Sequence, residues 1–121
     1  MRILISITPL MYREVLGLSI HRCRPDFEVL LAPPGPLDRR AERFRPHVLV
    51  QDADEDGLLF GVSDSVLCRI RLLVTGRMDA KIELDGTASK IHDVRFGDLF
   101  GVLERVEELS DQSLGHSPHV G

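Results

Sequence analysis

The side chains best suited to chemistry in this chain stand where short apolar runs end. Asp52 follows the run from Val48 to Val50, and Thr75 closes the run that begins at Ile70. A carboxylate in such a place can ligate a hard cation or cap a turn of the backbone. Further acidic residues follow at Asp54, Glu55 and Asp56. A functional site is therefore expected where these runs end. A solvated acidic loop without a site would have the same acidic composition.

Other reactive residue types lack the spacing that a catalytic or metal site needs. Cys23 and Cys68 form no Cys-x-x-Cys pair and have no histidine at ligand spacing, so we expect buried or half-buried packing residues and not nucleophiles. The glycines form no phosphate-binding G-x-G-x-x-G motif. The histidines are scattered at His21, His47, His92, His116 and His119. We therefore expect no metal ion, no cofactor and no enzymatic activity.

The composition is that of one small globular domain. Of 121 residues 43% are apolar, and 19 acidic against 15 basic residues give a formal net charge of -4. Such a chain has no general attraction for nucleic acid or for anionic membranes. No segment is long enough to span a bilayer, and Pro9 interrupts the short apolar run near the N-terminus. We expect a cytoplasmic protein whose partners are neither nucleic acids nor membranes.

Four short runs rich in Val, Ile and Leu predict strands that are covered on both faces, as in a parallel sheet. These runs are Ile3 to Ile7, Phe27 to Leu31, Val48 to Val50 and Ile70 to Thr75. Strands that alternate with helices predict a parallel sheet with helices on both faces. Because such sheets bind ligands at the carboxyl ends of their strands, a site would lie among Ser6 to Thr8, Asp52 and Thr75.

Helical segments alternate with these runs. The first begins near Pro9, carries apolar residues at Met11, Val15 and Leu18, and ends before Pro25. Helical spacing also predicts a short second helix with Leu37, Ala41 and Phe44, a turn or two after Ser63 with Val66 and Leu67, and a last helix with Phe96, Leu99, Phe100, Leu103 and Val106. We predict one domain over residues 1–109 and a flexible C-terminal tail over residues 110–121.

Several of these segments resemble the receiver domains of bacterial response regulators. PHVLVQD, which ends at Asp52, is similar to the receiver strand that carries the phosphoryl-accepting aspartate, and IRLLVTG is similar to the strand that ends in Thr or Ser. Lys90 follows Gly86 at the spacing of the receiver lysine. The resemblance implies a flavodoxin-like three-layer sandwich with a central, mostly parallel sheet. It also implies a phosphate site with Asp52 as the phosphoacceptor and Thr75 and Lys90 beside it.

The chain departs from receivers where the first strand ends. Receivers have an acidic pair there, because phosphoryl transfer to a carboxylate needs a divalent cation to offset charge on the incoming oxygens. This chain has Ser6, Ile7 and Thr8, none of which supplies a carboxylate. We therefore expect phosphorylation of Asp52 to be absent or feeble.

A second departure concerns the place of the fourth receiver helix. The segment AKIELDGTASKIHDV alternates polar and apolar residues on both sides of Asp85-Gly86, which is a strong signal for a β-hairpin. We favour a hairpin at residues 81–91 over a helix. In a hairpin, Lys90 need not point at Asp52.

The sequence favours a non-catalytic, receiver-like signalling domain that acts by binding a protein partner or a second copy of itself. One alternative is a working phosphoacceptor receiver that uses Asp52 and magnesium. Another is a flavodoxin-like domain that binds a small ligand at the same strand ends.

Overall fold

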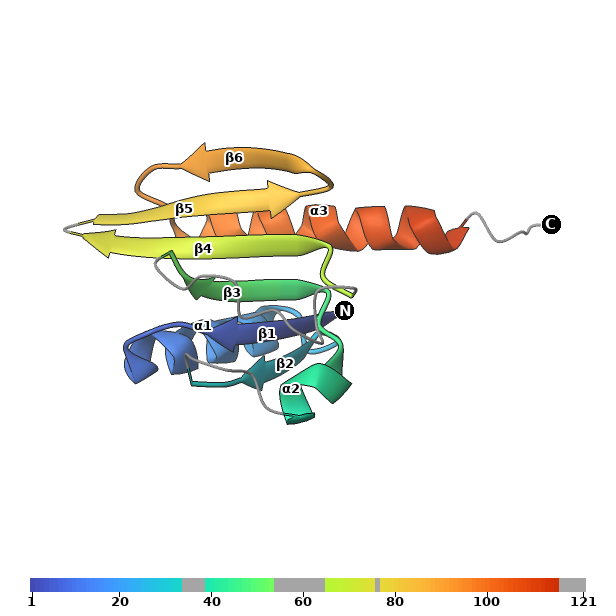
Figure 1. The fold of residues 1–121 in the computed structure, drawn as a ribbon, viewed down its shortest axis with the longest axis horizontal. Helices are drawn as coiled ribbons and strands as arrows, with labels where there is room; N and C mark the ends of the chain where they lie inside the picture. The colour runs from blue at the N-terminus through green and yellow to red at the C-terminus, as the bar shows by residue number, and fades with distance from the viewer. Residues whose placement is uncertain (34–38, 54–64, 76, 116–121) are drawn as a thin grey trace.

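The computed structural model of the chain is an α/β fold built on one six-stranded sheet (Figure 1). It describes residues 1–33, 39–53, 65–75 and 77–115. The strands are β1 Arg2–Ser6, β2 Glu28–Leu31, β3 Val48–Asp52, β4 Cys68–Thr75, β5 Arg77–Leu84 and β6 Thr87–Ile91. The helices are α1 Leu10–Cys23, α2 Arg39–Phe44 and α3 Phe96–Gly115.

The first four strands form the parallel part of the sheet, in the order β2-β1-β3-β4. The prediction that they are adjacent and parallel is confirmed. Leu4 and Ile5 point to opposite faces of β1 and are both fully buried. This burial on both faces explains why the strand reads as a continuous apolar run.

The predicted hairpin is confirmed, and it belongs to a longer antiparallel extension of the sheet. β5 and β6 pair in the register Leu84 with Thr87, and the connecting residues Asp85 and Gly86 have φ angles of 52° and 76°. Two positive φ angles suit a tight hairpin turn, and glycine adopts such an angle without a steric penalty. β5 also pairs with β4 along its whole length, so the sheet is mixed.

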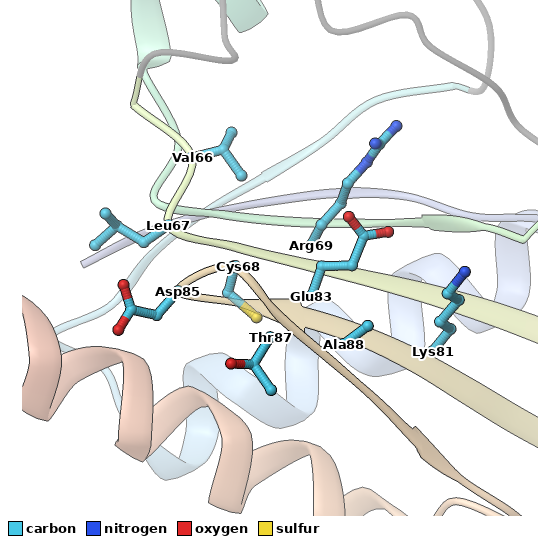
Figure 2. Close-up of a pocket in the computed structure, with 10 residues that line it drawn as sticks. Val66, Leu67, Cys68, Arg69, Lys81, Glu83, Asp85, Thr87 and Ala88 are labelled. Atoms are coloured by element: carbon cyan, nitrogen blue, oxygen red, sulfur yellow. The ribbon is translucent and has the colours of Figure 1, made fainter.

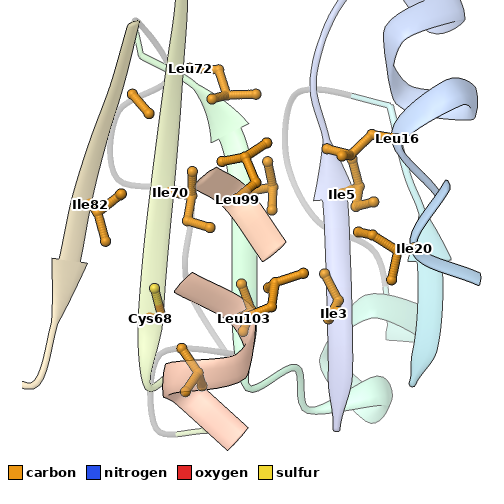
Figure 3. Close-up of a cluster of buried hydrophobic side chains, with 14 of the residues drawn as sticks. Ile3, Ile5, Leu16, Ile20, Cys68, Ile70, Leu72, Ile82, Leu99 and Leu103 are labelled. Carbon is orange, nitrogen blue, oxygen red and sulfur yellow. The ribbon is translucent and has the colours of Figure 1, made fainter. Parts of the chain in front are cut away.

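Helices cover both faces of the sheet, so that the fold has three layers. α1 and α3 share one face, where Leu16 and Ile20 of α1 and Leu99 and Leu103 of α3 pack on the strands (Figure 3). The short α2 packs on the other face. The smaller core on that face consists of Leu4, Ala32, Ala41 and Leu49.

Two predicted boundaries are wrong. α3 continues to Gly115, so residues 110–115 are helical and do not belong to a tail. No helix is present at Val66 and Leu67: Val66 has no regular secondary structure, and Leu67 lies in a bend before β4. Ser63 and Leu37, which were assigned to predicted helices, lie outside the described residues.

α1 is present as predicted, but its Met11, Val15 and Leu18 point away from the sheet. They are 64%, 57% and 52% exposed. The opposite side of the helix, with Leu16 and Ile20, packs on the core. Both sides of α1 are therefore apolar.

Two groups of polar contacts join distant parts of the chain. Arg24, which follows α1, donates hydrogen bonds to Asp26 and to Glu107 of α3, and its guanidinium stacks on Phe27. His47, just before β3, accepts a hydrogen bond at Nδ1 from the backbone N–H of Arg2, over 3.0 Å. Burial and the nearby positive charge of Arg2 lower the pKa of His47.

The lowered pKa of His47 makes the fold less stable in mild acid. Below a pH of about 6.5 the unfolded chain binds a proton at His47 that the folded chain resists. The free energy of unfolding therefore decreases as the pH is lowered, until the pH lies below the pKa of His47 in the folded chain. Urea denaturation across this range should show the loss. We expect His47→Gln, whose amide oxygen can still accept the Arg2 hydrogen bond, to flatten the profile, whereas His21→Gln should not. Equal pH profiles for both variants would contradict the attribution of this stability loss to His47.

Candidate functional site

The structure places Asp52 at the carboxyl end of β3, in contact with the loop that follows β1. Its Oδ1 accepts a hydrogen bond from the backbone N–H of Thr8 over 3.1 Å, and its Oδ2 accepts one from the Thr8 hydroxyl over 2.7 Å. Both carboxylate oxygens thus hold the loop between β1 and α1. Asp52 does cap a loop, but this loop lies far from it in sequence and is not the turn that follows β3.

Thr75 does not lie beside Asp52. The strand partner of Asp52 on β4 is Leu72, and Thr75 lies three residues further along β4, where it pairs with Arg77. Three residues of extended chain span about 10 Å. The side chain of Thr75 lies outside the described part of the chain. β4 overruns β3 in this way because it continues into an antiparallel pairing with β5.

Lys90 is further from Asp52 still. It lies on β6 at the edge of the sheet, opposite Lys81 of β5, with an exposed side chain. β6 is three strand positions from β3, a separation of about 14 Å at the usual spacing. The three residues of the predicted phosphate site are therefore not brought together.

Within the described residues, the carboxyl ends of the strands offer few ligands to a cation. The hydroxyl of Ser6, at the end of β1, donates to the carbonyl of Pro33 over 3.1 Å. Among the described residues, no group of three or more His, Cys, Asp and Glu side chains could hold a metal ion. The acidic residues Asp54, Glu55 and Asp56 lie outside the described part of the chain.

The two cysteines have different surroundings. Cys68 is buried, as predicted, and burial, aided by the negative charge of Glu83, raises the pKa of its thiol to about 12. That thiol stays protonated near neutral pH and is a poor nucleophile. Cys23 is exposed, so the expectation of a buried or half-buried packing residue is wrong for it.

An open pocket of about 470 Å³ lies at the opposite end of the sheet from Asp52. Figure 2 shows Arg69, Lys81 and Glu83 extending from the same face of β4 and β5 beside it. Arg69 donates to the side-chain oxygen of Gln51 on β3 over 2.7 Å. The sequence reasoning missed this polar face, although the alternation in Cys-Arg-Ile-Arg at 68–71 indicates it.

Most of the exposed large apolar side chains among the described residues lie on α1. We define the outer face of α1 as Leu10, Met11, Val15 and Leu18, each of which is more than half exposed. Beside it, Tyr12 and Val15 line an apolar groove of about 170 Å³ that reaches the start of α3. Its other lining residues are Ile7, Leu16, Leu72, Met78, Val94, Arg95, Phe96 and Leu99. The helical spacing of Met11, Val15 and Leu18 identified the stripe, but not the direction in which it points.

Comparisons with known proteins place the chain in no family: no family model, no curated protein and no solved structure matches it. Within the described residues, no helix combines the length and the apolar composition needed to cross a membrane. The function must therefore be argued from the geometry.

The hydrogen bonds between Asp52 and Thr8 should stabilise the fold. We expect Asp52→Ala to lower the free energy of unfolding by about 1 kcal/mol, because Thr8 then loses both acceptors and its donors turn to water. In a double-mutant cycle with Thr8→Val, the two losses should fall short of additivity by about 0.5 kcal/mol. Glu104→Ala, which removes an exposed carboxylate on α3, serves as the control in urea denaturation. Fully additive losses would mean that the two side chains do not act on each other.

Proposed function

We propose that this chain is a non-catalytic, receiver-like domain that acts by binding another protein through the outer face of α1. The exposure of Met11, Val15 and Leu18 carries the proposal. The parallel order β2-β1-β3-β4 is compatible with a flavodoxin-like layout, and the antiparallel β5 and β6 depart from it.

The physical reason for proposing a partner is that α1 is apolar on two sides. A helix that is apolar all round is normally buried on all sides, whereas a surface helix turns polar residues to water. α1 buries Leu16 and Ile20 and leaves a second apolar stripe uncovered. Large exposed apolar patches on soluble proteins commonly mark interaction sites. A protein partner that covers this face would remove its apolar side chains from water.

The surroundings of Asp52 argue against phosphoryl transfer. Both oxygens of Asp52 accept hydrogen bonds from Thr8, so an attack on phosphorus would compete with these contacts. The family's acidic pair is replaced by Ser6, Ile7 and Thr8, and the positions of Thr75 and Lys90 do not converge on the carboxylate. Among the described residues, no group of three or more His, Cys, Asp and Glu side chains could hold the cation that such a site needs.

Protein binding at α1 can be tested in the cells that naturally make this chain. We expect a photo-crosslinking residue in place of Val15 to give a discrete protein adduct, because the outer face of α1 would be covered. The same residue in place of Glu104, an exposed position on α3, is the control and should give none. Denaturing electrophoresis and mass spectrometry would measure the adducts. The absence of any adduct at Val15, or equal yields at both positions, would refute a contact through α1.

The phosphoacceptor alternative has its own test. We expect acetyl phosphate with magnesium to add no stoichiometric phosphoryl group, because Asp52 accepts hydrogen bonds from Thr8 and the end of β1, at Ser6 to Thr8, has no carboxylate to hold a cation. Intact-protein mass spectrometry would detect the addition, with Asp52→Asn as the control. Rapid modification that disappears in Asp52→Asn would establish the alternative in place of our proposal.

A further inference from the structure

We infer that the edge strand β6 binds an extended peptide of alternating acidic and apolar residues, which joins the sheet as an additional antiparallel strand. β6 is at the edge of the sheet away from α1 (Figure 1), so the inference goes beyond the proposed function and does not depend on it. An added strand forms main-chain hydrogen bonds with the edge, and its alternate side chains meet the two faces of the sheet. β6 has a free backbone edge, a cationic face and an apolar groove to receive such a peptide.

The outer edge of β6 carries backbone hydrogen-bonding groups that no described strand pairs with. β6 is the last strand of the sheet, and Thr87 to Lys90 are all exposed. Leu84 and Thr87, which flank the two-residue turn, bond to each other, and bonded pairs alternate along an antiparallel ladder. The backbone N–H and C=O groups of Ala88 and Lys90 therefore point away from β5, where an added strand can bond to them.

Three positive side chains form a row across one face of β4, β5 and β6, and the row ends at this edge. Arg71 is opposite Lys81, and Lys81 is opposite Lys90, with about 4.8 Å from strand to strand. We call these three residues the cationic row. Arg71 has Glu83 beside it, at 3.8 Å from Nε to Oε1, whereas no ion pair within the described chain includes Lys81 or Lys90. Like charges in directly opposed positions repel, so the row favours an anionic partner.

The composition of the three strands favours an acidic peptide over other occupants. Lys81 and Lys90 are the only lysines of the chain, and both are exposed. An acidic residue opposite Lys90 would make a favourable cross-strand pair. β6 contains no acidic residue, so a second copy of this strand cannot supply that charge. β4, β5 and β6 also contain no aromatic residue on which a nucleic-acid base could stack.

The other face of the hairpin supplies a largely apolar groove for the alternate side chains. This groove has a volume of about 330 Å³ and lies between the hairpin and α3. Its apolar lining includes Leu84 and Ile91 of the hairpin and Val102 and Leu109 of α3, all of which are half-buried. An added strand that points its acidic residues toward the cationic row turns the residues between them toward this groove. The peptide should therefore alternate acidic and apolar residues.

Fluorescence anisotropy with labelled synthetic peptides tests the inference on the full chain. The probe is an alternating valine and glutamate peptide of about six residues, the usual length of a strand, and its counterpart has lysine in place of glutamate. We expect the glutamate peptide to bind the wild-type chain more tightly than the lysine peptide. Because opposite charges attract across strands, Lys90→Glu should weaken binding of the glutamate peptide at least about threefold and strengthen binding of the lysine peptide.

Arg22→Glu is the matched control for Lys90→Glu. It makes the same change of charge at an exposed position of α1, and at about 0.15 M salt its effect on β6 is screened. We expect it to leave both affinities unchanged. Circular dichroism would verify that the two variants are folded. A glutamate peptide that does not bind the wild-type chain, or equal effects of the two substitutions, overturns the inference.

Methylation of the peptide backbone tests strand addition. In an antiparallel pair the residue directly opposite Lys90 exchanges backbone hydrogen bonds with it, so the amides of the acidic residues face β6 and those of the apolar residues face away. Methyl groups on the glutamate amides should abolish binding, whereas methyl groups on the valine amides should preserve it. Equal affinities of the two methylated peptides would overturn the addition of a strand.

Single-stranded nucleic acid is the competing occupant of the cationic row. An oligothymidylate serves as the probe in the same anisotropy measurement, and we expect it to bind more weakly than the glutamate peptide. An oligothymidylate that binds more tightly than the peptide, and loses that binding in Lys90→Glu, would assign the row to nucleic acid and overturn the inference.

Discussion

The central strands β1 and β3 are buried on both faces, and the positions of the helices follow from that burial. Ile3 and Val48 point to the face shared by α1 and α3, whereas Leu4 and Leu49 point to the face covered by α2. Full burial of such a side chain contributes about 1.5–3 kcal/mol, so neither face can be left open to water. α1 lies on the β1 side of the shared face, and α3 lies between β1 and β4 (Figure 3).

The hairpin of β5 and β6 determines how far apart the residues of the predicted phosphate site lie. It pairs with β4 along eight residues, so that β4 extends beyond the end of β3. This extension moves the backbone of Thr75 along the strand, away from Asp52, and the hairpin carries Lys90 to the edge of the sheet. A site at the carboxyl ends of parallel strands needs several strands to end together, and here β3 and β4 do not. The carboxylate of Asp52 instead holds the loop between β1 and α1.

α1 carries apolar side chains on the side that faces the sheet and on the side that faces away from it. Its inner side, with Leu16 and Ile20, is required by the core, and a polar outer side would have served solubility. The outer stripe is instead apolar, although its side chains are more than half exposed in the single chain. The packing of the described chain on itself therefore does not account for the apolar character of Val15 and Leu18.

The sequence by itself determined the elements whose signals are local. Apolar runs defined the four parallel strands, the Asp85-Gly86 turn defined the hairpin, and the missing carboxylates at Ser6 to Thr8 indicated a departure from receiver chemistry. Local patterns determine such features because period and turn geometry depend on neighbouring residues.

The tertiary structure decided what depends on residues far apart in sequence. Met11, Val15 and Leu18 have the same spacing whether they face the sheet or the solvent, and α1 could turn either of its two apolar sides inward. The packing of Leu16 and Ile20 on the strands determines which side of α1 faces the sheet. In the same way, the contact of Asp52 with Thr8 joins residues 44 positions apart, and it exists because β1 and β3 are neighbours in the sheet.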